Sequence, residues 1–277
     1  MLAALLALAA SLTWGSSNYL AGVESRKRSV WQVTALSQLA AVAVSAVAVL
    51  VSHQGPPGLL DTFVLFLGGV ATTIGIVAFY RALAIGTMSV VAPIIAGTVL
   101  VPVTYGLLTG ERPGLPAYVG MVCTIGGIVL VAWAKSSARN HAHTSAVLLA
   151  VLAAACWGFT LLTFGTAGKG DPYWGVFDVR LTSICVILLF MLATRRAVKV
   201  RGQNLPAMLA IGALLTVANI LFTLATGHGY LSVVSVLGSL SPVVVTAYAQ
   251  TLLHERLAVH QWAGFAAVLA GIVLLSV

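Results

Sequence analysis

The chain has 277 residues, of which 60% are hydrophobic and 7% charged, with a mean hydropathy of +1.05 and a formal net charge of +8. A soluble domain carries roughly 25% charged residues, so this composition excludes a soluble globular protein and favours an integral membrane protein. The basic residues lie in short loops between apolar stretches and form no face interleaved with aromatic residues. We therefore expect the lipid bilayer as a partner, and no nucleic acid.

Apolar stretches of spanning length follow one another along the whole chain. They cover residues 2–21, 30–51, 61–80, 89–108 and 115–134, and then 145–166, 174–193, 206–226, 230–253 and 259–276. Each is too long for a membrane β-strand, which needs only about 9–11 residues, and backbone polar groups in hydrocarbon must be hydrogen-bonded internally. We predict an all-α integral membrane fold of ten transmembrane helices. We expect the first stretch to be a membrane span and not a signal peptide, because its equivalent recurs in mid-chain.

The second half of the chain repeats markers of the first half. The spacing is 143 residues up to Tyr248 and 144 residues beyond it. The repeated pairs are Trp14 and Trp157, Gly15 and Gly158, Tyr105 and Tyr248, Gly120 and Gly264, and Gly127 and Gly271. We therefore predict two copies of one five-helix unit, at 1–134 and 145–277, joined by a linker loop at 135–144. In a membrane protein a duplicated half is typical of a transporter.

The distribution of basic residues indicates how the two copies lie in the membrane. Since each half has five spans, the second copy enters the membrane from the opposite side, so the repeats are inverted. The loops on one side hold 11 Lys or Arg residues and those on the other hold only Arg112 and Lys169, while Arg180 falls inside a span. The positive-inside rule then predicts a multi-pass protein of the cell inner (plasma) membrane, with the linker in the cytoplasm and both termini outside.

The carboxy-terminal part of the chain carries a compound pattern. Leu240-Ser241-Pro242 is followed by Leu-His-Glu-Arg-Leu at residues 253–257, and then by the spaced glycines Gly264 and Gly271. This pattern resembles the EamA family of the drug/metabolite transporter superfamily, and the resemblance covers the whole chain. It implies a ten-helix carrier with two repeats, often an exporter of metabolites or amino acids, and not an enzyme.

The first half departs from the family pattern at two places. The first half has Glu111-Arg112-Pro113 in place of the Glu-Arg-Leu pattern. The family tends to carry an arginine in the second helix of each unit, and Arg180 matches it in the second half while Ser37-Gln38 stand there in the first. The two halves are therefore not equivalent at the site that the resemblance implies.

Two charged residues lie within the seventh span. Charges inside a membrane cost about 2.5–3.5 kcal/mol each on insertion scales, and they usually face a water-filled cavity. Arg180 is a candidate for binding a carboxylate or phosphate group of the substrate, and Asp178 is the candidate for proton coupling. The alternative is that Asp178 lies near the interface and Arg180 extends to lipid headgroups. The two side chains are two residues apart, so they point to different faces of the helix.

Aromatic and amide side chains complete the candidate substrate site. Inverted repeats place equivalent residues about an axis near the bilayer midplane, where a carrier holds its substrate. Ordinary packing, an interfacial aromatic belt or helix-bridging hydrogen bonds are the alternatives. The candidates for lining the site are Trp14, Tyr105, Trp157, Asn219, Tyr248 and Gln250.

Other polar residues are interpreted as structural. Glu111, Arg112, Glu255 and Arg256 stand at helix ends near the interface, too shallow for coupling. His141 and His143 would give two metal ligands without a third, so we expect no metal and no cofactor. The glycine pairs of the fifth and tenth spans are expected to pack either the two halves or the two chains of a homodimer together.

The sequence as a whole favours a secondary transporter for a small organic metabolite, namely an amino acid, an amine or a drug-like compound. It would act in efflux or exchange, by alternating access through a central cavity. One alternative is an integral-membrane enzyme acting on a lipid or isoprenoid, which would need clustered acids or histidines that the six scattered acidic residues do not provide. The other is a membrane subunit that transports nothing itself.

Overall fold

The protein is described by a computed structural model, which places residues 2–53, 55–108, 114–132, 141–169, 171–195, 205–228, 234, 237–238, 240–254 and 258–275. The first half comprises α1 (Leu2–Lys27), α2 (Val30–Ser52), α3 (Leu59–Ile85), α4 (Met88–Ile95), the 3₁₀ segment η1 (Ala96–Val99), α5 (Leu100–Leu108) and α6 (Leu115–Ala132). The second half comprises α7 (His141–Thr166), the 3₁₀ segment η3 (Ala167–Lys169), α8 (Pro172–Ala193), α9 (Leu205–His228), α11 (Ser241–Leu252) and α12 (Val259–Leu275).

These elements match the spans expected from the sequence. In the first half α4, η1 and α5 follow one another through the fourth expected span, and in the second half α11 covers the described end of the ninth. Within the described part of the chain, five helices are long and apolar enough to cross a membrane: α2, α3, most of α7, α8 and most of α9. The prediction of an all-helical membrane fold is confirmed.

Local sequence explains where several helices begin and bend. Asp171 caps α8, since its Oδ1 accepts hydrogen bonds from the backbone N–H groups of Tyr173 at 2.9 Å and Trp174 at 3.2 Å. Pro172 follows at the first helical position, where its missing N–H costs nothing. Pro93 lies inside α4, three residues before the chain tightens into η1. A proline inside a helix removes one hydrogen bond of the ladder, and the fourth span is interrupted here by a 3₁₀ segment.

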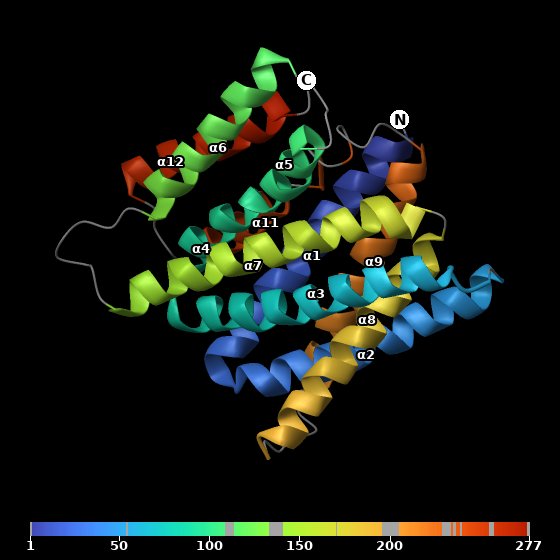
Figure 1. The fold of residues 1–277 in the computed structure, drawn as a ribbon. Helices are drawn as coiled ribbons and strands as arrows, with labels where there is room; N and C mark the ends of the chain where they lie inside the picture. The colour runs from blue at the N-terminus through green and yellow to red at the C-terminus, as the bar shows by residue number, and fades with distance from the viewer. Residues whose placement is uncertain are drawn as a thin grey trace.

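The two halves contact each other reciprocally. A methyl group on Gly15 of α1 would overlap Val244 and the carbonyl oxygen of Ser241 on α11. Its equivalent, Gly158 of α7, would meet Val101 of α5 and the carbonyl oxygen of Thr98 in η1. The partners Thr98 and Val101 are equivalent to Ser241 and Val244, 143 residues later. The first half therefore packs on the second through the same contact by which the second packs on the first. Figure 1 shows α1 and α7 running in opposite directions, as inverted repeats require.

Helices α6 and α12 form a separate pair at one edge of the bundle (Figure 1). Gly127 of α6 faces the carbonyl oxygen of Gly264 and the backbone of Val268, while Gly271 of α12 faces Thr124 and the carbonyl oxygen of Gly120. This exchange of equivalent contacts shows that the glycines pack the two halves of one chain together, which is the first of the two roles expected for them. A homodimer stays a prediction.

The linker expected at 135–144 divides at the start of α7. Residues 141–144 belong to the first turn of that helix, and residues 135–140 lie outside the described part of the chain.

The carboxy-terminal end of α1 is held by hydrogen bonds to the end of α3. The Arg26 guanidinium donates hydrogen bonds to the carbonyl oxygens of Leu83 and Gly86, each at 3.0 Å. These bonds tie the end of α1 to the end of α3.

Candidate functional site

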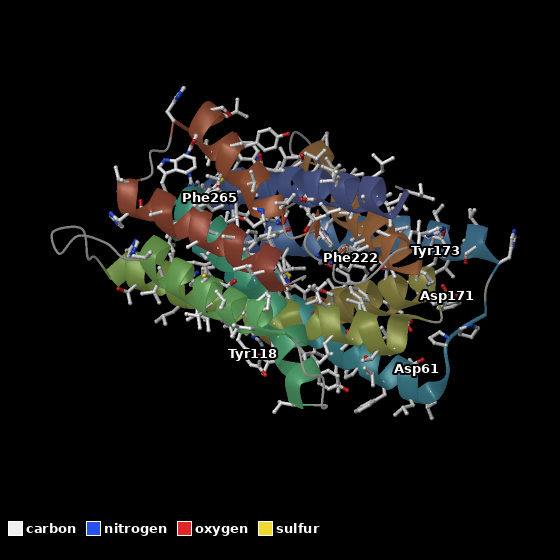
Figure 2. The ribbon with its side chains drawn as sticks, turned by 90° about the horizontal axis from the view of Figure 1, so that it is seen from above. Asp61, Tyr118, Asp171, Tyr173, Phe222 and Phe265 are labelled. Carbon is white, nitrogen blue, oxygen red and sulfur yellow. The ribbon has the colours of Figure 1, made fainter. Side chains whose placement is uncertain are left out.

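Trp14 of α1 and Asn219 of α9 meet between the two halves. The indole Nε1 of Trp14 donates a hydrogen bond to the Asn219 amide oxygen at 2.8 Å, and the indole ring lies 5.2 Å from the ring of Phe222, centroid to centroid. Phe222 stands one turn further along α9, and Figure 2 shows its side chain in the interior of the helix bundle. Asn219 is 8% exposed, whereas Trp14 is half-buried. The structure thus joins two residues that the sequence nominated separately.

The equivalent contact in the other half keeps the aromatic pair and loses the polar one. Trp157 of α7 lies 5.0 Å from the ring of Phe79 on α3 and packs against Gly75. Phe79 is the counterpart of Phe222, but the counterpart of Asn219 is Ile76, which cannot hydrogen-bond an indole. The hydrogen bond from indole to amide is therefore found on the α1–α9 side and not on the α3–α7 side, where the hydroxyls of Thr72 and Thr160 pair instead at 2.9 Å.

Tyr248 of α11 also faces α1. Its hydroxyl lies 3.4 Å from the Ser16 hydroxyl, and its ring lies 5.1 Å from the ring of Tyr19. Ser16 and Tyr19 correspond to Phe159 and Leu162 in the second half, so this polar pairing is again present on one side only. Tyr105, the counterpart of Tyr248, is 45% exposed, and Gln250 is a half-buried residue of α11.

Arg180 lies at the crossing of α8 with α2. Its guanidinium is 2% exposed, and its Nη1 donates a hydrogen bond to the Gln38 amide oxygen at 3.3 Å. Arg180 is the ninth residue of α8, so it stands about 12 Å along the helix from Pro172. At this depth its side chain packs among helices and does not extend to headgroups. That observation contradicts the alternative of an arginine extending to the headgroups.

Two further side chains enclose Arg180. Tyr80 of α3 is 2% exposed, shares a hydrogen bond with the Ser37 side chain and lies within electrostatic range of the guanidinium. Ser37 and Gln38 are themselves fully buried. Within the described residues the Arg180 Nε and the Gln38 Nε2 are both buried and have no hydrogen-bond partner. The cluster of Arg180, Gln38, Tyr80 and Ser37 therefore joins α2, α3 and α8.

Asp178 lies apart from this cluster. It is half-buried, and its Oδ2 is enclosed without a hydrogen-bond partner among the described side chains. Asp171, seven residues earlier, caps the start of the same helix at one end of the bundle (Figure 2). The expectation that Asp178 and Arg180 point to different faces of α8 agrees with these surroundings.

Some nominated residues lie beyond what the structure describes, and some contacts were not foreseen. Glu111, Arg112, Glu255 and Arg256 fall outside the described residues. The sequence did not nominate Phe222, Ser16 or Ser37 for the site, because their residue types are ordinary in membrane helices. Among the described side chains, no three of the His, Cys, Asp and Glu type gather as a metal site would need.

Two repeats that pack on each other reciprocally, with polar residues between them, form the architecture typical of a membrane transporter of the duplicated type. A family model described as the EamA-like transporter family matches residues 1–133 and again residues 144–277. The chain therefore belongs to the EamA-like transporter family, and it is a multi-pass membrane transporter and not an enzyme. The alternatives of a membrane enzyme and of a subunit without transport activity are accordingly wrong.

A solved structure supports the fold independently. A crystal structure of a protein that is 20% identical in sequence superposes with a TM-score of 0.71, covering 98% of this chain and 97% of its own. At this level of identity the similarity concerns the fold alone. No curated protein sequence matches the chain.

Proposed function

We propose that the protein is a secondary carrier for a small organic metabolite, an amino acid, an amine or a drug-like compound, which it exports or exchanges by alternating access. The observation that supports this most is the layer of Trp14, Asn219 and Tyr248, which joins α1 of the first half to α9 and α11 of the second. Inverted-repeat carriers hold their substrate where the halves meet. A substrate there contacts both halves and senses their relative movement.

The chemistry of this layer suits an amphipathic molecule. The aromatic faces of Trp14, Phe222 and Tyr248 offer apolar contact and attract a cationic group if the substrate carries one. The Asn219 amide and the Tyr248 hydroxyl supply hydrogen-bonding groups beside those rings. In this proposal the substrate site is also lined by Trp157, Tyr105 and Gln250. Of these, Trp157 and Tyr105 lie on the less polar side of the site.

The interruption of the fourth span by η1 supports alternating access. Pro93 weakens the hydrogen-bond ladder just before η1, and η1 and α5 pack against α7 of the other half. A bend at this contact can absorb the change in angle when one half rocks against the other. We place both termini outside the cell, since 11 of the 14 basic residues then flank the cytoplasmic side.

Asp178 is our candidate for carrying a coupling proton. Of the six acidic residues it is the only one well inside an expected span. Its Oδ2 is enclosed and has no hydrogen-bond partner among the described side chains, so no described group competes with a proton for that oxygen. Binding and release of a proton at this group would then accompany the movement of α8.

The test is transport by the purified full-length protein in proteoliposomes. Amino acids, nucleosides and cationic dyes are offered with and without a pH gradient. We expect uptake or exchange of members of at least one class, and an at least tenfold lower rate in Trp14→Ala. The control is Trp262→Ala, since Trp262 of α12 is 46% exposed and packs beside Phe265 away from α1. Equal losses in both variants, or no transport of any class, would contradict the proposal.

A further inference from the structure

Arg180 has a hydrogen-bonding capacity that the described helices do not use. A guanidinium carries five N–H donors and stays protonated in proteins. Here the Nη1 group donates to the neutral Gln38 amide at 3.3 Å, and the buried Nε has no partner. No acidic side chain of the described part of the chain forms an ion pair with it. Burying a cation with one neutral partner is costly.

Gln38 contributes a second unused donor to the same cluster. Its amide oxygen accepts from Arg180, which leaves the amide Nε2 buried without a partner. Turning the amide over would set the Nε2 donors against the guanidinium donors, so the orientation with the oxygen toward Arg180 is the favourable one. Two donor groups, from α8 and from α2, are therefore available side by side.

A carboxylate is the group that these donors fit. A carboxylate accepts hydrogen bonds without donating any, and its planar pair of oxygens matches the guanidinium fork. Its single negative charge balances the single positive charge of Arg180. A phosphate monoester carries about −1.5 to −2 at neutral pH, so part of its charge would stay uncompensated beside the neutral Gln38. The charge balance thus selects the carboxylate.

From this cluster we infer that the transported molecule carries a carboxylate and that Arg180 and Gln38 bind it during the transport cycle. The inference rests on the proposed carrier function and specifies its substrate class. The contact of α2 with α8 is a contact between equivalent helices, so it lies on the pseudo-twofold axis. A group bound there becomes reachable from either side of the membrane when the halves rock.

The position of the cluster relative to the aromatic layer sets the shape of the substrate. Gly212 of α9 packs against the carbonyl oxygen of Ser37 and against Ala41 on α2. Gly212 therefore lies beside the turn of α2 that carries Gln38. Asn219 stands seven residues further along α9, or about 10 Å. A substrate whose carboxylate is held by Arg180 and whose organic body reaches Trp14 and Asn219 has to span a distance of this order. This length suits an aromatic or long-chain acid rather than acetate.

The experiment compares matched acids and amides. Binding of N-acetyltryptophan and of N-acetyltryptophanamide to the detergent-purified full chain is measured by the shift in Tm, and uptake of labelled tryptophan and indole-3-acetate is measured in proteoliposomes. We expect the wild type to prefer the acid over the amide at least tenfold. Arg180→Gln should lower acid binding and uptake at least tenfold and leave amide binding within twofold. Gln38→Leu should lower the preference about threefold.

A control separates charge recognition from helix packing. The Thr216 hydroxyl on α9 donates to the Ala41 carbonyl oxygen on α2 at 3.2 Å, so Thr216→Val removes a buried polar contact to the same helix without changing charge. It should keep the wild-type preference. Equal loss of acid and amide binding in Arg180→Gln would overturn the inference and assign Arg180 a structural role.

The inference and the proposed function fail in different ways. If the wild type transports amines, nucleosides or neutral compounds and no carboxylate, the carboxylate site is wrong and the carrier function stands. If the wild type transports no compound of any class, the carrier function itself fails, and the carboxylate site fails with it. Transport of acids that is unchanged in Arg180→Gln would also overturn the inference.

Discussion

The indole N–H of Trp14 on α1 donates a hydrogen bond at 2.8 Å to the amide oxygen of Asn219 on α9. The repeated tryptophan, Trp157, keeps the aromatic neighbour Phe79 but has Ile76 at the position equivalent to Asn219. Two copies of one unit have therefore kept the same packing and diverged in polarity. The predictions below use this difference and the close contacts that accompany it.

Replacing Asn219 with isoleucine should remove the hydrogen bond and leave the Trp14 N–H without a partner. Interhelical hydrogen bonds in membrane proteins contribute about 0.6 kcal/mol on average and up to about 1.7, so we expect a loss of that order in unfolding free energy. The double variant with Trp14→Phe should lose less than the sum of the two single variants. Unfolding in mixed detergent micelles measures the three values, and strict additivity would contradict the contact.

Gly15 and Val244 should behave as a pair. A methyl group on Gly15 overlaps the Val244 side chain, and overpacking of this kind costs about 1–3 kcal/mol. We expect Gly15→Ala to lower the Tm of the purified protein. Val244→Gly removes both side-chain atoms that the new methyl group meets, so Gly15→Ala should cost less in the Val244→Gly background than in the wild type. The control is Gly165→Ala, because nothing lies within 4 Å of a Cβ at that position. A Gly15→Ala protein as stable as the wild type would refute the close approach.

The loss of stability in Gly127→Ala, on α6, should not be restored by a second substitution in a neighbouring side chain. A Cβ there would lie 2.6 Å from the carbonyl oxygen of Gly264 and 2.7 Å from the backbone nitrogen of Val268. Backbone atoms of a packed helix cannot move aside as a side chain can, so Val268→Ala should not restore the stability lost in Gly127→Ala. The adjacent Gly126 has open space around it, and Gly126→Ala should be neutral or stabilising by up to about 1 kcal/mol. Thermal unfolding of the variants distinguishes these outcomes.

Asp178→Asn should abolish proton coupling if this carboxylate carries the proton. The measurement is the pH change inside proteoliposomes when substrate is added, together with uptake driven by a pH gradient. We expect the proton signal to vanish in Asp178→Asn while exchange of substrate for substrate continues. Asp171→Asn is the matched control. It removes the same charge at the start of α8 and keeps the helix cap, because asparagine caps helices as well as aspartate. Proton movement retained in Asp178→Asn would exclude this role.

The orientation can be tested at two exposed positions between helices. Ser29 stands between α1 and α2, and Gly58 stands between α2 and α3. In a chain freed of Cys123, Cys156 and Cys185, we expect Ser29→Cys to react with an impermeant reagent only after the cells are opened. Gly58→Cys should react in intact cells. The reverse pattern would contradict the placement of both termini outside.

The spans and the repeat could be predicted from the sequence because both depend on local composition. Apolar stretches of spanning length fix the helices, and the paired markers at a constant spacing fix the repeat. The exact helix ends could not be predicted, and α3 extends to Ile85 where the apolar stretch was expected to end at 80.

The contacts of the candidate site could be predicted only in part. Trp14 and Asn219 were both nominated, but nothing in either helix alone says that the two residues face each other across the halves. Arg180 and Gln38 had a usable signal, because they occupy neighbouring positions in equivalent helices of the repeat. Equivalent helices that cross on a twofold axis bring such residues together. The sequence alone does not say which equivalent helices cross, since that depends on the packing of the whole bundle.

The burial of Arg180 has an electrical consequence for the transport cycle. With a carboxylate bound, the cluster at α2 and α8 is neutral overall, whereas the empty carrier keeps one positive charge in the membrane interior. A charge that crosses a potential of 100 mV changes in energy by about 2.3 kcal/mol. If Arg180 binds the substrate in this way, the membrane voltage acts on the return of the empty carrier and not on the loaded step. A transient charge movement in the absence of substrate would mark that return.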